Sequence, residues 1–150
     1  MRIRRLVIHC TDTPEGREVS ADDIRRWHTL PPPAGRGWKQ VGYTDLIHLD
    51  GRVERLVKNN EDANVDPWEV TNGAQGYNST SRHIVYAGGR ARNGAFADTR
   101  TMAQKSSMEK YVKDFHHRFP DVEICGHHDL NPAKPCPCFD VKMWLKTIGL

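Results

Sequence analysis

Histidine and cysteine residues follow apolar segments of this sequence at positions where they could bind a metal ion. His9 lies near the end of the apolar run Leu6–Cys10. His127 follows the apolar run Val122–Gly126, and Cys136 comes nine residues later. Two imidazoles and one thiolate suit Zn²⁺, and three protein ligands leave a position open for water, as in catalytic zinc sites. We therefore expect these three residues to bind a catalytic zinc ion.

The separation of the three residues along the chain also favours catalysis. His9 and His127 are 118 residues apart, so the site would connect the two ends of the fold. Compact zinc fingers instead use ligand pairs about two to four residues apart. Strand ends are rigid, and a ligand set built on them can be held in place before the metal binds.

Other interpretations of these residues stay open. A lone histidine such as His9 is more often a hydrogen-bonded core or surface residue than a ligand. Cys10 reads as a small buried apolar residue. A closed structural zinc site would instead use Cys125, His127, Cys136 and Cys138, although Cys136-Pro137-Cys138 is a tight spacing for two ligands of one tetrahedral ion. His128 is expected to have a structural role or to contact the metal ligands without binding the metal itself.

The strands that must position these residues are indicated by short apolar runs. Leu6–Cys10 predicts a buried strand, and Arg82–Ala87 and Val122–Gly126 predict further strands. Tyr43–Leu49 and Arg52–Val57 flank Asp50-Gly51, a pair typical of a two-residue hairpin turn. The intervening segments 34–42, 59–80 and 127–138 are expected to be loops.

Helices are indicated by caps and by apolar residues at helical spacing. Ser20 and Asp23 predict a capping box for a helix that ends near Thr29, before three prolines. A long helix is predicted over 101–119, and Asp140 is expected to cap a last helix. The predicted order β, α, β, β, β, α, β, α indicates an α/β fold, a single domain whose mixed central sheet is flanked by helices.

Composition limits the class of protein. A chain of 150 residues with 37% hydrophobic and 27% charged residues is typical of one globular domain. The net charge of +3 is small, and charges of both signs are interleaved, which argues against a nucleic-acid partner. No apolar run has the length of a membrane span.

The amino-terminal apolar run is too short for the core of a signal peptide. We therefore expect the chain to be cytoplasmic as synthesised and to reach any target outside by release or by another export route. In such a chain the four cysteines indicate metal binding or catalysis rather than a disulfide framework.

Taken together, these motifs resemble the type 2 N-acetylmuramoyl-L-alanine amidases, which include bacteriophage lysozyme-like amidases and peptidoglycan recognition domains. The resemblance covers nearly the whole chain. It rests on Val7–Thr11, Ile24–His28, Val41–Tyr43, Asp50-Gly51, Gly76–Asn78 with Ser81, Gly126–Asp129 and Lys134–Asp140. The first and last of these motifs are specific in combination, whereas the middle ones are weak alone.

The resemblance implies an amidase-like fold over residues 1–150, with zinc bound by His9, His127 and Cys136 and with Tyr43 and Lys134 as catalytic residues. It implies hydrolysis of the amide between N-acetylmuramic acid and L-alanine, with peptidoglycan as partner, and we expect a monomer. A peptidoglycan-binding module without catalysis is the alternative, although such relatives typically lack the cysteine ligand. A zinc-stabilised nucleic-acid module is disfavoured by the interleaved charges.

The chain departs from the family pattern at four positions. Thr44 and Gly73 stand where relatives often carry histidine. Arg82 and His83 replace a pair of residues that is usually small and apolar. All four positions are expected near the cleft in which the substrate would bind.

Overall fold

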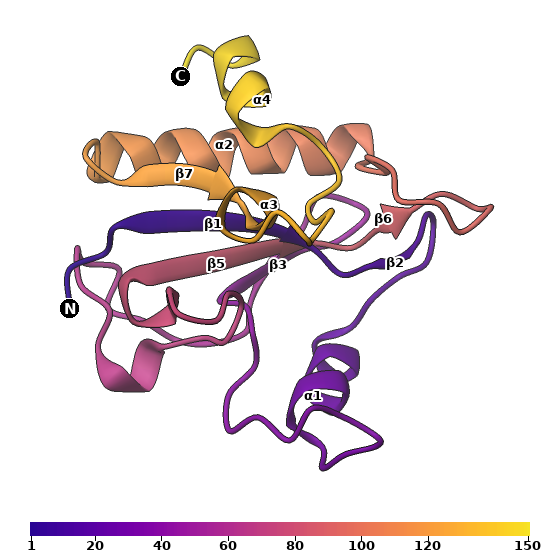
Figure 1. The fold of residues 1–150 in the computed structure, drawn as a ribbon. Coiled ribbons are helices and arrows are strands. Elements are labelled where there is room, and N and C mark those ends of the chain that lie inside the picture. Colours follow the sequence, from indigo (N-terminus) through magenta and orange to yellow (C-terminus); the bar gives the residue numbers. More distant parts are fainter.

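A five-stranded sheet lies at the centre of the computed structural model, which describes residues 1–150 (Figure 1). Its strand order is β4-β3-β5-β1-β7. The strands are β1 (Arg5–Cys10), β3 (Asp45–Ile47), β4 (Val53–Arg55), β5 (Ser81–Tyr86) and β7 (Glu123–Gly126). Neighbouring strands are parallel except for β4, which pairs antiparallel with β3 at one edge. The mixed central sheet predicted from the sequence is confirmed.

The two central strands are covered on both faces. All six residues of β5 are buried, as are five of the six in β1. A strand buried on both faces has no solvent side and therefore needs no polar alternation. The continuous apolar run Leu6–Cys10 is such a strand.

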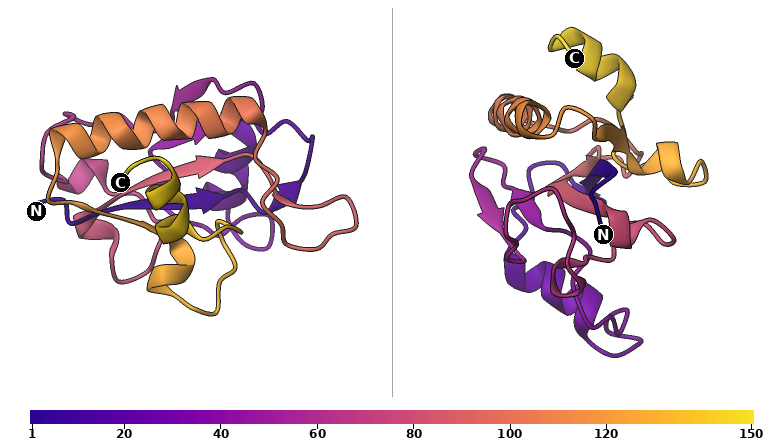
Figure 2. Two further views of the ribbon diagram at one scale, coloured as in Figure 1. Left: turned by 90° about the horizontal axis from the view of Figure 1, so that it is seen from above. Right: turned by 90° about the vertical axis from the view of Figure 1, so that its left-hand side faces the viewer.

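Helices cover both faces of the sheet (Figure 2). The helices α2 (Met102–Arg118) and α4 (Val141–Thr147) lie on one side, and α1 (Ala21–Thr29) lies on the other. Buried residues of α2 at helical spacing, Met108, Val112 and Phe115, pack into one apolar cluster with β1 and β5. A second cluster packs Ile24 of α1 against the opposite face. The sheet is thus the middle of three layers.

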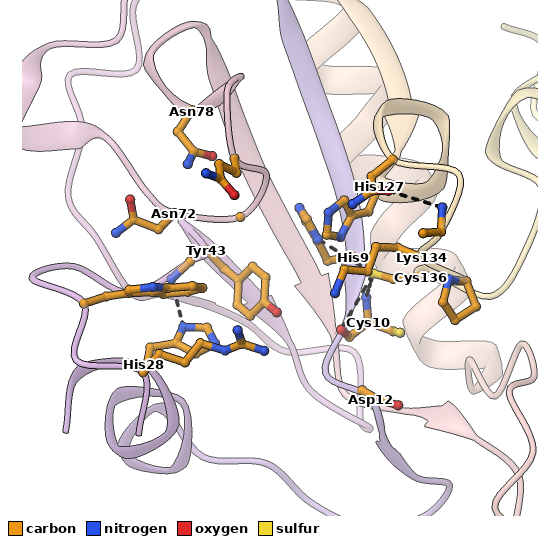
Figure 3. Close-up of a pocket in the computed structure, with 18 of the residues that line it drawn as sticks. His9, Cys10, Asp12, His28, Tyr43, Asn72, Asn78, His127, Lys134 and Cys136 are labelled. Carbon is orange, nitrogen blue, oxygen red and sulfur yellow. Dashed lines mark hydrogen bonds between the residues drawn. The ribbon is translucent and has the colours of Figure 1, made fainter. Parts of the chain in front are cut away.

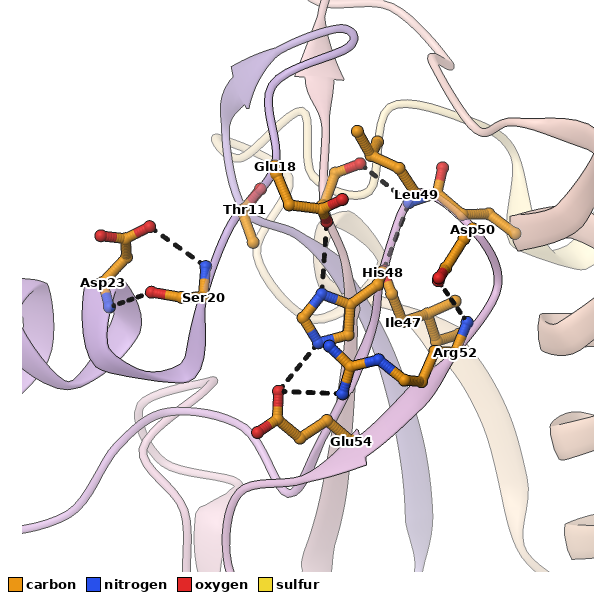
Figure 4. A network of polar contacts seen from close by, with 12 residues as sticks. Thr11, Glu18, Ser20, Asp23, Ile47, His48, Leu49, Asp50, Arg52 and Glu54 are labelled. Carbon is orange, nitrogen blue, oxygen red and sulfur yellow. Dashed lines mark hydrogen bonds and ion pairs between the residues drawn. The ribbon is translucent and has the colours of Figure 1, made fainter.

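The starts of the helices follow from their caps, of which the sequence predicted those at Ser20 and Asp140. Ser20 Oγ accepts from the Asp23 backbone N–H at 3.0 Å, and the Asp23 carboxylate accepts from the Ser20 N–H at 3.1 Å (Figure 4). Thr101 and Gln104 form a second capping box at the start of α2. Asp140 Oδ1 accepts from the Met143 N–H and caps α4. The three helices predicted from the sequence are confirmed.

The hairpin differs from its prediction. Its strands are three residues each, and the predicted two-residue turn is wrong, because the His48 N–H donates to Arg52 O around three intervening residues. Gly51 has φ +88° there, as in three-residue hairpin loops that end in a left-handed residue. A Cβ on Gly51 would lie 2.8 Å from Ala103 O, so α2 packs directly on this turn.

Short elements occur that the sequence did not indicate. The strands β2 (Thr13–Pro14) and β6 (Gly89–Arg90) form a separate two-stranded sheet. The segment 59–80 contains two 3₁₀ turns, η1 (Pro67–Glu69) and η2 (Asn78–Thr80). Local periodicity cannot reveal elements of two or three residues, which depend on distant partners.

The start of the segment 127–138 was also predicted wrongly as loop. One helical turn, α3 (His127–Leu130), begins directly after β7. The Gly126 N–H donates to Asp129 Oδ2 at 2.8 Å, which holds the first turn of this helix on the end of the strand.

A buried histidine attaches the segment before α1 to the hairpin (Figure 4). His48 Nε2 lies 2.8 Å from Glu54 Oε1, and its Nδ1 lies 3.3 Å from Glu18 Oε1. These contacts connect the segment that leads into α1 to the outer edge of the sheet.

The structure contains no helix with the length and apolar character that a membrane span requires.

Candidate metal centre and pocket

Strand register brings the two candidate histidine ligands together. The strands β1 and β7 are parallel neighbours, and Ile8 lies opposite Gly126. His9 follows Ile8 and His127 follows Gly126, so the two histidines meet at the same end of the sheet. Their ring centroids are 4.8 Å apart.

Cys136 reaches the same point because the proline-rich segment turns back over the strand end. The His128 backbone N–H donates to Cys136 O at 2.9 Å, and the Cys10 N–H donates to Cys136 Sγ at 3.1 Å. A Cβ on Gly126 would lie 2.8 Å from Pro137 Cδ, so a larger residue there would push this segment away. The glycine permits the close approach of strand and loop.

The structure brings His9, His127 and Cys136 into one group whose candidate ligand atoms all lie within 4.8 Å of one another. The distance from His9 Nδ1 to Cys136 Sγ is 3.7 Å. Two imidazoles and a thiolate around one point are a donor set that suits zinc, with space for a further ligand on the pocket side. The residues present therefore fit the ion expected from the sequence.

The electrostatics of the group favour the neutral form of both imidazoles. Burial lowers the pKa of His9 well below its ordinary value, and the neighbouring His83 and His127 lower it further. Burial also lowers the pKa of His127, with a second contribution from the positive charge of Lys134. Only a neutral imidazole has a lone pair for a metal, so protons compete weakly at this site.

The remaining cysteines lie outside the group. Cys125 is buried within β7, and burial raises the pKa of its thiol to about 12. Cys138 Sγ instead lies 3.8 Å from Cys10 Sγ. The structure therefore does not assemble the closed site of four ligands that the sequence left open. His128 also stays outside, with Nδ1 at 3.3 Å from Cys136 O, on the helical turn α3.

The candidate ligands form one end of a pocket of about 780 Å³ (Figure 3). Both residues expected to be catalytic, Tyr43 and Lys134, line this pocket. Lys134 lies two residues before Cys136 in the turn that follows α3, where its N–H donates to Asn131 O at 2.9 Å. Tyr43 lies on the facing wall, two residues before the start of β3.

The Tyr43 ring is held between two histidines. Its centroid lies 5.1 Å from that of His9 and 5.2 Å from that of His28. Burial raises the pKa of the Tyr43 hydroxyl, and nearby Cys136 and Cys10 act in the same direction. The phenol is therefore protonated at neutral pH and available as a hydrogen-bond donor.

The wall beyond Tyr43 is formed by residues to which the sequence assigned no role. His28 Nδ1 accepts from the Gly42 N–H at 2.9 Å, and its ring packs against Trp38 at 4.9 Å. Arg36 stacks on Trp38 from the predicted loop, and Asn72 anchors the adjacent segment through Gln40 O. In the sequence, only the presence of Trp38 and Arg36 in the loop after the three prolines could have indicated this wall of the pocket.

His83 is a further residue, whose contact with a candidate ligand the sequence did not predict. It is fully buried on β5, and its Nδ1 lies 2.8 Å from His9 Nε2. Burial and the neighbouring His127 lower its pKa to about 3. Of the other departures from the family pattern, Gly73 lies against this ring, while Thr44 and Arg82 are buried and outside the pocket lining. Two departures from the family pattern, Gly73 and His83, thus lie in contact with each other. Their joint occurrence was the feature of the sequence that could have indicated this contact.

Comparison with known proteins gives a consistent result. A family model described as N-acetylmuramoyl-L-alanine amidase matches residues 1–139. The endolysin of Enterobacteria phage K11 is 34% identical over 140 residues, which cover 93% of this chain and 83% of that protein.

Solved structures share the fold. The N-acetylmuramoyl-L-alanine amidase LysC from Clostridium intestinale superposes with a TM-score of 0.72 at 20% identity, over 99% of this chain and 87% of that one. Drosophila PGRP-LB superposes with a TM-score of 0.70 at 17% identity, over 97% and 81% of the two chains. At these identities the likeness is one of fold.

Proposed function

Since this chain belongs to the N-acetylmuramoyl-L-alanine amidase family, we propose that it cleaves the amide between N-acetylmuramic acid and L-alanine in peptidoglycan with a zinc ion bound by His9, His127 and Cys136. The family establishes the chain as an amidase of peptidoglycan. The zinc ion, its three ligands and the catalytic roles of Tyr43 and Lys134 are our proposal. Residues 1–150 would form the zinc amidase domain, which we expect to act as a monomer.

One observation supports this proposal above the others. Three residues that are up to 127 positions apart in the chain converge within 4.8 Å at the end of a pocket, and both expected catalytic side chains line that pocket. A structural zinc site would have no need of an adjoining pocket of about 780 Å³. The pocket is large enough for a sugar and the first residues of a peptide.

The chain's own residues have distinct tasks. A zinc ion at this site would supply a Lewis acid that activates water and polarises the scissile carbonyl. The Lys134 ammonium, whose charge already influences His127, would stabilise the negative charge that develops on the carbonyl oxygen. The protonated Tyr43 hydroxyl would orient the attacking water or assist proton transfer.

A peptidoglycan-binding module without catalysis is the second candidate. The fold shared with Drosophila PGRP-LB is compatible with binding alone. The presence of Cys136 within the ligand group favours hydrolysis, because recognition alone does not require a third metal ligand. The endolysin relatives suggest that the chain acts on the cell wall after release from the cell in which it is made.

Digestion of purified muropeptides tests the proposal. The chain, loaded with one equivalent of zinc, should release stem peptides with a free amino-terminal alanine, detected by mass spectrometry. Removing the metal with a chelator should stop the release, and adding zinc back should restore it. Binding to peptidoglycan sacculi without release of peptides would support the binding module instead.

A further inference from the structure

The buried ring of His83 contacts a proposed ligand rather than the pocket. His83 lies on β5 with no solvent exposure, and its Nδ1 is 2.8 Å from His9 Nε2. Its other ring nitrogen, Nε2, lies 3.0 Å from Asn78 Oδ1. The second nitrogen of His9, Nδ1, faces Cys136 Sγ at 3.7 Å. Asn78, His83 and His9 thus form a hydrogen-bonded chain that ends at the proposed metal centre.

A backbone N–H group next to Asn78 fixes which groups donate and which accept in this series of hydrogen bonds. The Ala74 N–H can only donate, and it lies 2.8 Å from Asn78 Oδ1, which identifies that atom as the amide oxygen. An amide oxygen only accepts, so His83 Nε2 must carry the proton in its bond to Asn78. The Asn78 amide therefore sets the tautomer of His83.

The tautomer of His83 in turn determines that of His9. His83 is fully buried, and neither of its two partners is negatively charged, so the ring is neutral and its Nδ1 can only accept. His9 Nε2 must then donate, and a neutral His9 ring has its lone pair on Nδ1. This is the nitrogen that faces Cys136.

Gly73 provides the space that this arrangement requires. A Cβ on Gly73 would lie 2.5 Å from His83 Nδ1 and 2.6 Å from its Cγ. The backbone of Gly73 has no left-handed φ, so glycine is required there for space alone, which the His83 ring and, at 2.8 Å, the backbone oxygen of Gly42 both occupy. Any larger residue would displace the ring from His9.

We propose that His83 is a positioning residue of the metal centre, which holds His9 in the Nε2–H tautomer and so directs its Nδ1 lone pair towards the metal. This inference rests on the proposed metal centre. Groups that orient a metal-bound histidine commonly contribute a factor of about 10–100 in metal affinity. His83 performs that task from inside the sheet, with Asn78 as its support and Gly73 as the gap it occupies.

Nitrogen-15 NMR of the histidine-labelled chain of 150 residues measures the tautomers directly, both before and after one equivalent of zinc is added. His9 and His83 should both carry their proton on Nε2 in the zinc-free chain. On zinc addition, the Nδ1 resonance of His9 should shift while its Nε2 remains protonated. A proton on Nδ1 of His9, or zinc bound through Nε2, would overturn the proposal.

Zinc affinity, measured by competition with a chromophoric chelator, gives a second readout. His83→Leu removes the acceptor and should weaken zinc binding by about 10–100-fold. His83→Asn places an amide oxygen near the position of Nδ1 and should retain most of the affinity. Gly73→Ala should weaken binding through displacement of His83, and His117→Leu on the exposed face of α2 is the control. Equal affinity of wild type and a folded His83→Leu would refute the role of His83.

Different outcomes contradict the proposed metal centre and the proposed role of His83. If the wild-type chain takes up no zinc, the proposed metal centre is wrong, while the tautomer of His9 in the same sample still decides whether His83 orients it. If His83→Leu does not fold, the NMR of the wild type remains decisive, because it measures the tautomer of His9 directly.

Discussion

Cys136 supplies the one soft ligand of the proposed site. Thiolate is softer than imidazole and brings a negative charge to the metal. Cys136→Ser should therefore lose zinc on dialysis and lose amide hydrolysis, as measured by elemental analysis and muropeptide digestion of one preparation. Cys138→Ser is the matched control, because Cys138 lies against Cys10 rather than in the ligand group. If the two variants lose zinc equally, the ligand assignment is wrong.

Tyr43 and Lys134 are proposed to act on the substrate rather than on the metal. Tyr43→Phe keeps the ring between His9 and His28, and Lys134→Met keeps the apolar stem. Both variants should retain zinc, but removing a group that stabilises only the transition state commonly lowers kcat by about 10²–10³-fold with little change in KM. The comparison needs zinc content and steady-state kinetics on the same samples. Near wild-type kcat in both zinc-loaded variants would exclude them as the catalytic pair.

At the scale of elements, His28 connects α1 to the loop that precedes β3. Its Nδ1 accepts from the Gly42 N–H, and protonation of that nitrogen would break the bond. Burial, with a smaller effect of Arg36, lowers the pKa of His28 to about 4. The unfolded chain takes up this proton near pH 6.5, which is the ordinary value for histidine.

The sign of the pH effect on stability follows from these two values. Above about pH 6.5 neither state is protonated at His28, so its contribution is constant. As pH falls from about 6.5 to about 4, the unfolded state binds more protons, and the free energy of unfolding should decrease by up to about 1.4 kcal/mol per pH unit from this residue. Urea denaturation of the zinc-free chain should show a shallower decrease for His28→Asn, which keeps an acceptor but does not titrate. Parallel curves for the two proteins would contradict the assignment.

At the scale of the whole molecule, the proposed metal connects the two ends of the chain. His9 comes from the first strand, while His127 and Cys136 follow the last one, and the unfolded chain has no preformed site. Zinc at about 100 times its Kd should therefore stabilise the folded chain by about 2.7 kcal/mol, or roughly 5–10 °C in Tm. Calorimetry with and without a chelator measures this shift. Cys136→Ser should show no such shift, and an equal shift in that variant would place the stabilising metal elsewhere.

The sequence by itself determined the features that depend on neighbouring residues. The predicted caps at Ser20 and Asp140 fixed the starts of α1 and α4, because a cap satisfies backbone groups within one turn. The buried strands β1, β5 and β7 were visible as apolar runs. With the family resemblance, these sufficed to predict a mixed sheet between helices and to name candidate ligands at strand ends.

Only the tertiary structure decided how distant residues meet. The register of β1 against β7 places His9 beside His127, and the missing side chain of Gly126 lets the Cys136 segment approach. The hydrogen bond from His9 to His83 and the space left by Gly73 likewise join positions that are up to 74 residues apart. Such contacts depend on strand pairing and on the volume of a single side chain. Neither quantity is contained in local periodicity, and for that reason the sequence showed His83 only as an unexplained departure from the family pattern.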